Sequence, residues 1–98
     1  MSKFGELINI PIPVLLDFYK EENDPSTTMH PILRDVAAAV GDTGKVIKID
    51  VEKNDELAQA LRVKVLPTLI IYKDGEMKWR QSGELDADTL ISKMKEFA

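Results

Sequence analysis

The apolar residues change their spacing along this chain, and each spacing predicts a different element. Residues 14–19 form a short run of aliphatic and aromatic side chains before a charged stretch, which is typical of a strand buried on both faces. Over residues 29–40 the apolar positions recur every three or four residues, which predicts an amphipathic helix. Asp24 is suited to cap the start of this helix, Pro31 is expected to kink it, and Gly41 is suited to end it.

A second strand is predicted at residues 45–51, where β-branched residues return after a turn. A strand, a helix and a second strand make a right-handed βαβ unit, so we expect these two strands to be parallel neighbours. A short helix should follow, with Asn54 as its cap and Leu57, Ala58 and Leu61 pointing inward.

A hairpin and a final helix are predicted for the rest of the chain. Residues 68–72 and 77–81 read as strands, and the Asp-Gly pair at 74–75 between them is a strong hairpin signal. The last helix should start after Asp86 as its cap, and a short helix is possible at residues 3–8. The predicted fold is therefore an α/β domain with a four-stranded mixed sheet in the order 2-1-3-4 and helices on both faces.

Composition restricts the chemistry. The 98 residues fit a single domain, 1–98, with its core at about 14–97, and the net charge of −4 argues against a nucleic-acid partner. No run is long and apolar enough for a membrane span, and the first residues do not resemble a signal peptide, so we expect a cytoplasmic protein without membrane contact. The chain has no cysteine and one histidine, His30, so we expect no metal and no cofactor. We expect a monomer.

Several motifs together resemble the thioredoxin family. They are residues 14–19, 31–33, 46–51, 65–69 and 72–76, followed by Gly83, and the resemblance runs from about Val14 to Phe97. It implies a thioredoxin-like fold and a family-level connection to cell redox homeostasis. The amino-terminal strand and helix of many members look truncated. Where the family carries its Cys-x-x-Cys pair, this chain has Asn23 and Ser26, so thiol–disulfide exchange is chemically excluded.

The resemblance also implies a binding surface. In the family, the bond corresponding to Leu66-Pro67 is cis, and its loop lies against the active-site loop and pairs with an extended substrate peptide. We expect the chain to bind a protein or peptide segment at the former active site and the cis-proline loop, a set of residues named here the tip surface. The tip surface consists of Glu22, Asn23, Asp24, Pro25, Ser26, Val65, Leu66, Pro67 and Gly83. The acidic residues Glu21, Glu22 and Asp24 favour a basic segment, although they are also consistent with a merely solvated loop.

Other polar residues leave alternatives open. Asp17 and Lys48 interrupt two adjacent strands and are expected to form a partly buried ion pair, with burial raising the pKa of Asp17. With Ser26 they could instead serve an enzyme of unrecognised chemistry, though hydroxyl residues at a helix start more often satisfy backbone groups. A third possibility is an auxiliary or scaffold protein of a redox pathway that uses another surface, such as the strand carrying Trp79.

Overall fold

The structure is a computed structural model that describes residues 3–98, with the backbone but not the side chains of residues 24–26. The elements, in chain order, are α1 (Lys3–Ile8), β1 (Val14–Tyr19), α2 (Asp24–Val40), the 3₁₀ helix η1 (Gly41–Thr43), β2 (Lys45–Asp50), α3 (Asp55–Ala60), β3 (Thr68–Lys73), β4 (Glu76–Ser82) and α4 (Ala87–Glu96). None of the helices in the described part is both long enough and apolar enough to cross a membrane.

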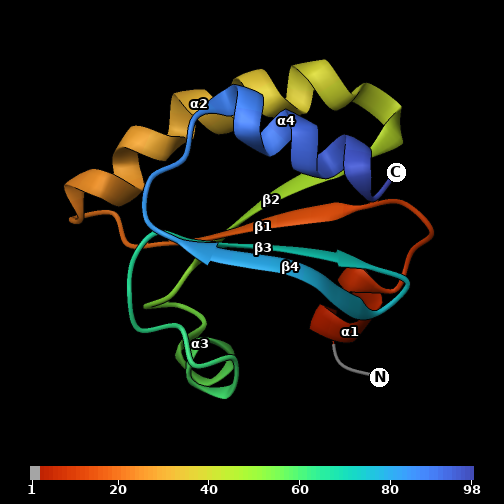
Figure 1. The fold of residues 1–98 in the computed structure, drawn as a ribbon. Coiled ribbons are helices and arrows are strands. Elements are labelled where there is room, and N and C mark those ends of the chain that lie inside the picture. The colour runs from red at the N-terminus through yellow and green to blue at the C-terminus, as the bar shows by residue number, and fades with distance from the viewer. Residues whose placement is uncertain (1–2) are drawn as a thin grey trace.

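The four strands form one mixed sheet in the order β2-β1-β3-β4 (Figure 1). β1 runs parallel to β2 and antiparallel to β3, and β3 runs antiparallel to β4. This is the predicted order. β1 and β3 are central because their side chains are nearly all buried, whereas β4 exposes most of its residues at one edge and β2 buries only Ile49 fully at the other.

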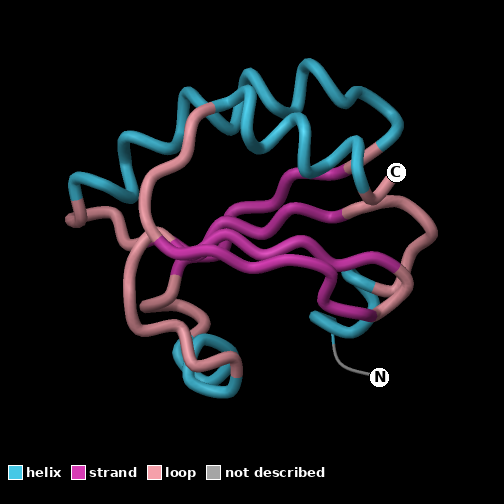
Figure 2. Tube along the Cα trace, viewed as in Figure 1, coloured by secondary structure: helices cyan, strands magenta, loops and turns pink. Residues whose placement is uncertain are grey.

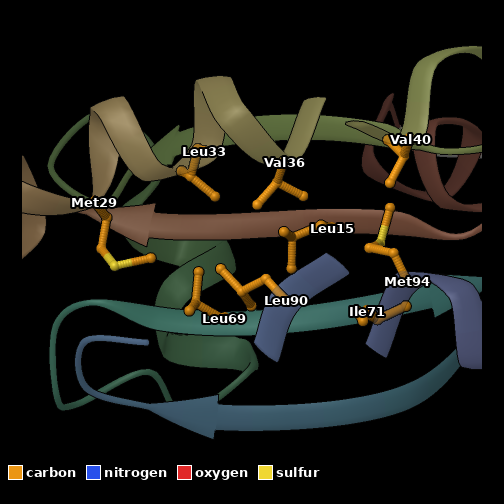
Figure 3. Close-up of a cluster of buried hydrophobic side chains, with 9 residues drawn as sticks. All are labelled: Leu15, Met29, Leu33, Val36, Val40, Leu69, Ile71, Leu90 and Met94. Carbon is orange, nitrogen blue, oxygen red and sulfur yellow. The ribbon is translucent and has the colours of Figure 1, made fainter. Parts of the chain in front are cut away.

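Helices cover both faces of the sheet, α2 and α4 on one and α1 and α3 on the other (Figures 1 and 2). Alternate side chains of each central strand point to opposite faces, which splits the core in two. The core between the sheet and the helices α2 and α4 consists of Leu15, Met29, Leu33, Val36, Val40, Leu69, Ile71, Leu90 and Met94 (Figure 3). The opposite face buries Ile8, Val14, Leu16, Phe18, Ile49, Ile70 and Tyr72.

The ends of the elements follow the predicted signals with two corrections. Gly41 has φ +53°, and the hairpin turn at Asp74 and Gly75 has φ values of +54° and +80°. The amide of Thr89 donates to the Asp86 carboxylate at 2.8 Å, so Asp86 caps α4 as predicted.

The first correction concerns α2, which begins at Asp24 itself, so that Asp24 is helical and Asn23 precedes the helix. The second concerns Asn54, which precedes α3 but makes no side-chain capping bond. Its side-chain amide donates instead to the carbonyl of Asp50, at 2.9 Å. That carbonyl, at the end of an edge strand, also accepts from the backbone amide of Asn54 at 3.0 Å, so Asn54 closes the end of β2 rather than the start of α3.

Candidate functional site

The tip surface is assembled at one end of the sheet. β1 and β4 end there and β3 begins there, because Phe18 pairs with Thr68 and Thr68 pairs with Ser82. The loop after β1, the loop before β3 and the residue after β4 therefore lie at the same end. In Figure 1 this is the left end, where the first turn of α2 projects beyond the sheet.

The loop before β3 presents one apolar side chain to solvent. The Leu66-Pro67 peptide bond is cis. Val65 is 57% exposed, while Leu66 is half-buried against the core beneath α3 and Pro67 is buried. The amide of Gly83 donates to the carbonyl of Pro67 at 2.8 Å. The structure thus brings Pro67 and Gly83, two predicted residues of the tip surface, into direct contact.

Thr68 holds this loop from below, and sequence reasoning did not identify it. Its side chain is fully buried, and its hydroxyl donates to the carbonyl of Val65 at 2.5 Å. The same hydroxyl lies 3.0 Å from the hydroxyl of Ser82 on β4. Thr68 therefore links Val65 to the end of β4. A hydroxyl directly after Pro67 in an otherwise apolar strand was the available signal.

Arg80 supports the same loop from the neighbouring strand, and it was also missed. Its guanidinium donates to the carbonyl of Arg62 at 2.9 Å and to the carbonyl of Leu61. Arg62 has a positive φ of 55°, which leaves its carbonyl outside the preceding helix. Because residues 61–66 contain no helix or strand beyond α3, these bonds help to position the approach to Val65.

The acidic side of the tip surface is only partly described. Glu21 and Glu22 are exposed, and Asn23 is half-buried. The amide of Asn23 donates to the carbonyl of Lys20, and the carbonyl of Asn23 accepts from the amide of Thr27, both at 3.0 Å. This tight turn feeds directly into α2. The sequence had assigned an acidic group to Asp24, a first-turn position to Pro25 and a possible nucleophile to Ser26. The side chains of these three residues lie outside the part of the chain that the structure describes.

The predicted ion pair between Asp17 and Lys48 is wrong in its geometry. The two residues are paired in register, but Asp17 is fully buried while Lys48 is exposed. Neither carboxylate oxygen of Asp17 has a hydrogen-bond partner within the described part of the chain. Burial raises the pKa of Asp17 from 3.8 to about 7, and the more distant charge of Lys48 opposes the shift. The long side chain of Lys48 reaches solvent because β2 is an edge strand.

His30, on α2, is half-buried beside β1. Its ring lies edge to face with that of Tyr19, with centroids 5.1 Å apart and planes at 81°. Its Nδ1 is buried and makes no hydrogen bond to any described group. Burial and then the positive charge of Lys48 lower the pKa of His30, so it is neutral near pH 7. Burial and, to a smaller extent, the negative charge of Asp50 raise the pKa of Tyr19.

Two other candidate sites find little support. Apart from residues 1–2 and the side chains of 24–26, no group of three or more histidine, aspartate or glutamate residues is arranged to hold a metal ion. Trp79 is half-buried and packs against the core beneath α2 and α4, so much of its ring serves the fold rather than an exposed contact.

The chain resembles known proteins over nearly its whole length. It is 40% identical to chloroplastic thioredoxin Y of Oryza sativa subsp. japonica over 95 residues, covering 96% of this chain and 56% of that protein. It is 34% identical to a thioredoxin-like protein of Synechocystis, covering 98% of this chain and 92% of that protein. The chain spans little more than half the length of its plant relatives, 56% and 57% for the rice protein and thioredoxin Y2 of Arabidopsis thaliana.

Solved structures agree with the sequence comparisons. A mutant thioredoxin from Halobacterium salinarum superposes with a TM-score of 0.88 at 29% identity, covering 99% of this chain and 84% of that one. Mitochondrial thioredoxin 3 from Saccharomyces cerevisiae superposes with a TM-score of 0.85 at 26% identity, covering 96% and 87%. The Thioredoxin family model matches residues 1–96. Although its sequence contains no cysteine, this chain belongs to the thioredoxin family.

Proposed function

We propose that this protein lacks thiol–disulfide exchange activity and binds an extended protein segment at the tip surface. Exchange needs one thiolate to attack a disulfide and a second thiol to release the product. The positions that carry these thiols in the family resemblance are Asn23 and Ser26, and no cysteine stands elsewhere in the sequence. Recognition does not depend on sulfur, so it can remain when the chemistry is lost.

The observation that carries the proposal is an exposed apolar side chain on a well-anchored loop. Val65 is one of three large apolar residues that are strongly exposed in the described part, at 57%. None of the hydrogen bonds found there uses the backbone amide or carbonyl of Leu66. An extended segment can therefore pair with that amide and carbonyl while covering Val65. Because Thr68 and Gly83 already hold the loop, little conformational entropy should be lost on binding.

Charge suggests which segments bind best. Glu21 and Glu22 are both exposed beside the start of α2, and the whole chain carries a net charge of −4. A basic segment would be attracted to this side of the tip surface and an acidic one repelled. The preferred partner is therefore an extended segment with an apolar residue for Val65 and a lysine or arginine for the Glu21–Glu22 side.

The proposal can be tested with peptides selected from a random library against the native protein. The affinity of each selected peptide would then be measured for the native chain, for Val65→Asp and for Met77→Asp. Met77 is the matched control because it is 44% exposed but lies in β4 next to the hairpin turn, at the other end of the sheet. Val65→Asp should weaken binding about tenfold or more, since a covered carboxylate in place of valine would be a buried charge without a partner, and Met77→Asp should leave binding unchanged.

Two results would contradict the proposal. One is a set of selected peptides whose affinities respond equally to Val65→Asp and Met77→Asp. The other is a selection that yields only peptides that leave the nuclear magnetic resonance signals of Val65, Leu66 and Gly83 unchanged. Glu21→Lys with Glu22→Lys provides the charge test, because it should weaken the basic peptides most.

A further inference from the structure

The second feature that suggests recognition is the free edge of β2, far from the β4 edge. In the described part of the chain β2 pairs only with β1, so it is the outermost strand on that side (Figure 1). An outer strand keeps one row of backbone donors and acceptors unpaired, which is a template for an added strand.

The unpaired groups belong to the even-numbered residues of β2. The amide of Lys45 donates to the carbonyl of Pro13, and the amide of Val51 donates to the carbonyl of Tyr19, both at 3.0 Å. Because backbone groups alternate in direction along a strand, residues 45, 47, 49 and 51 face β1, and residues 46, 48 and 50 face outward. Asn54 already occupies the carbonyl of Asp50. Val46 and Lys48 therefore offer two amides and two carbonyls to a partner.

A hollow lies beside this edge on each face of the sheet. On the α1 and α3 face it measures about 250 Å³, and on the α2 face about 160 Å³. The larger has apolar walls from Phe4, Leu7, Ile47, Ile49 and Leu57, and the smaller from Leu33, Ala37 and Val46. Leu7 is 41% exposed at the rim of the larger hollow. Successive side chains of an added strand point to opposite faces, so they would enter these two hollows in turn.

The edge is basic although the chain as a whole is acidic. Lys48 lines both hollows, Lys3 lines the larger one and Arg34 the smaller one. An adjoining hollow adds Lys45 and one carboxylate, Glu6. Four cations therefore line these hollows with one carboxylate, and Asp50 at the end of β2 adds a second carboxylate to the edge, in a chain of net charge −4. This excess selects for an acidic occupant.

We infer that the edge of β2 is a second protein-binding surface, which takes an extended partner segment of alternating apolar and acidic residues as an added strand. The apolar residues would fill the larger hollow on the α1 and α3 face, and the acidic residues, on the opposite face, would lie beside the smaller hollow with Arg34 and Lys48. A second copy of this chain fits less well, because pairing two β2 edges would bring their lysines together, and like charges on facing strands are destabilising.

The test uses an acetylated and amidated hexapeptide of alternating valine and glutamate, titrated into ¹⁵N-labelled native protein. Its control is a hexapeptide of alternating valine and lysine. The first peptide should shift the amide signals of Val46 and Lys48 and slow their hydrogen exchange, while the signals of Leu66 and Gly83 stay in place. Lys48→Glu should weaken this binding about fivefold or more. Lys95→Glu, an exposed change of equal charge on α4, should have a much smaller effect.

Other outcomes would overturn the inference. Absence of saturable shifts at Val46 and Lys48 up to about 1 mM peptide would exclude even weak strand addition. Equal binding of the lysine peptide would show that charge does not select the occupant. Concentration-dependent self-association that broadens the signals of β2 without peptide would identify a second copy as the occupant instead. Shifts confined to Leu66 and Gly83 would assign the peptide to the tip surface alone.

Discussion

Asp17 and Lys48 stand opposite each other in register on β1 and β2, yet only Lys48 reaches solvent. The Asp17 carboxylate is fully buried, and no described group hydrogen-bonds to it. A charge in that position is only partly compensated by Lys48, which is why burial governs the pKa of Asp17. The residue is therefore a source of instability at neutral pH rather than a stabilising ion pair.

The first prediction concerns the pH dependence of stability. The carboxyl titrates near 3.8 when unfolded and at about 7 when folded, so the folded state holds the proton more tightly. The contribution of Asp17 to the free energy of unfolding is therefore most favourable below pH 4, and it declines as the pH rises toward 7. Three pKa units correspond to at most about 4 kcal/mol. Asp17→Asn should raise the free energy of unfolding by about 2–4 kcal/mol at pH 8, as measured by urea denaturation.

The same comparison at low pH is the control. At pH 4 Asp17 is already neutral in the folded state, so the difference between the native chain and Asp17→Asn should fall to about 1 kcal/mol or less. Asp35→Asn, at an exposed position on α2, should change little at either pH. If Asp17→Asn raises the free energy of unfolding by the same amount at pH 4 and at pH 8, the raised pKa does not belong to Asp17.

The second prediction concerns the anchor of the tip surface. Thr68→Val keeps the shape of the side chain but removes the hydroxyl that contacts Val65 and Ser82. Because Thr68 is fully buried, the change should lower the free energy of unfolding by about 1–3 kcal/mol, and amide exchange around Val65 should become faster. Ser82→Ala removes only one partner at an exposed position and should have the smaller effect. Unchanged exchange near Val65 would mean that Thr68 does not hold this loop.

The third prediction concerns Arg80. Arg80→Leu removes the two donors that bind the carbonyls of Leu61 and Arg62. It should lower the free energy of unfolding by about 1 kcal/mol and raise amide exchange in residues 61–66 above that of the rest of the chain. Lys78→Leu, on the same strand, is the control because its charged group pairs with Glu76 next to the hairpin turn. Equal effects of both changes on residues 61–66 would contradict the role of Arg80.

The strands and helices could be predicted because each follows from local pattern. The continuous apolar run at 14–19 indicated a central strand, and the Asp-Gly turn indicated the hairpin. The exposure of Lys48 did not follow, although the predicted sheet order already placed its strand at an edge, because the sequence does not show whether a long lysine side chain turns toward a buried carboxylate or reaches solvent. Thr68 and Arg80 were missed for a similar reason. Their partners are carbonyls from other segments, which only the tertiary structure brings within reach.

The central proposal is that this chain keeps the thioredoxin fold but carries out no thiol–disulfide exchange, because it has no cysteine. Reduction of insulin by dithiothreitol tests it most directly, with the native chain compared to buffer and to the double variant Asn23→Cys, Ser26→Cys. A thiol at the start of α2 should have a lowered pKa, so the double variant should accelerate reduction. The native chain should give the rate of buffer alone. A clear acceleration by pure native protein would contradict the claim.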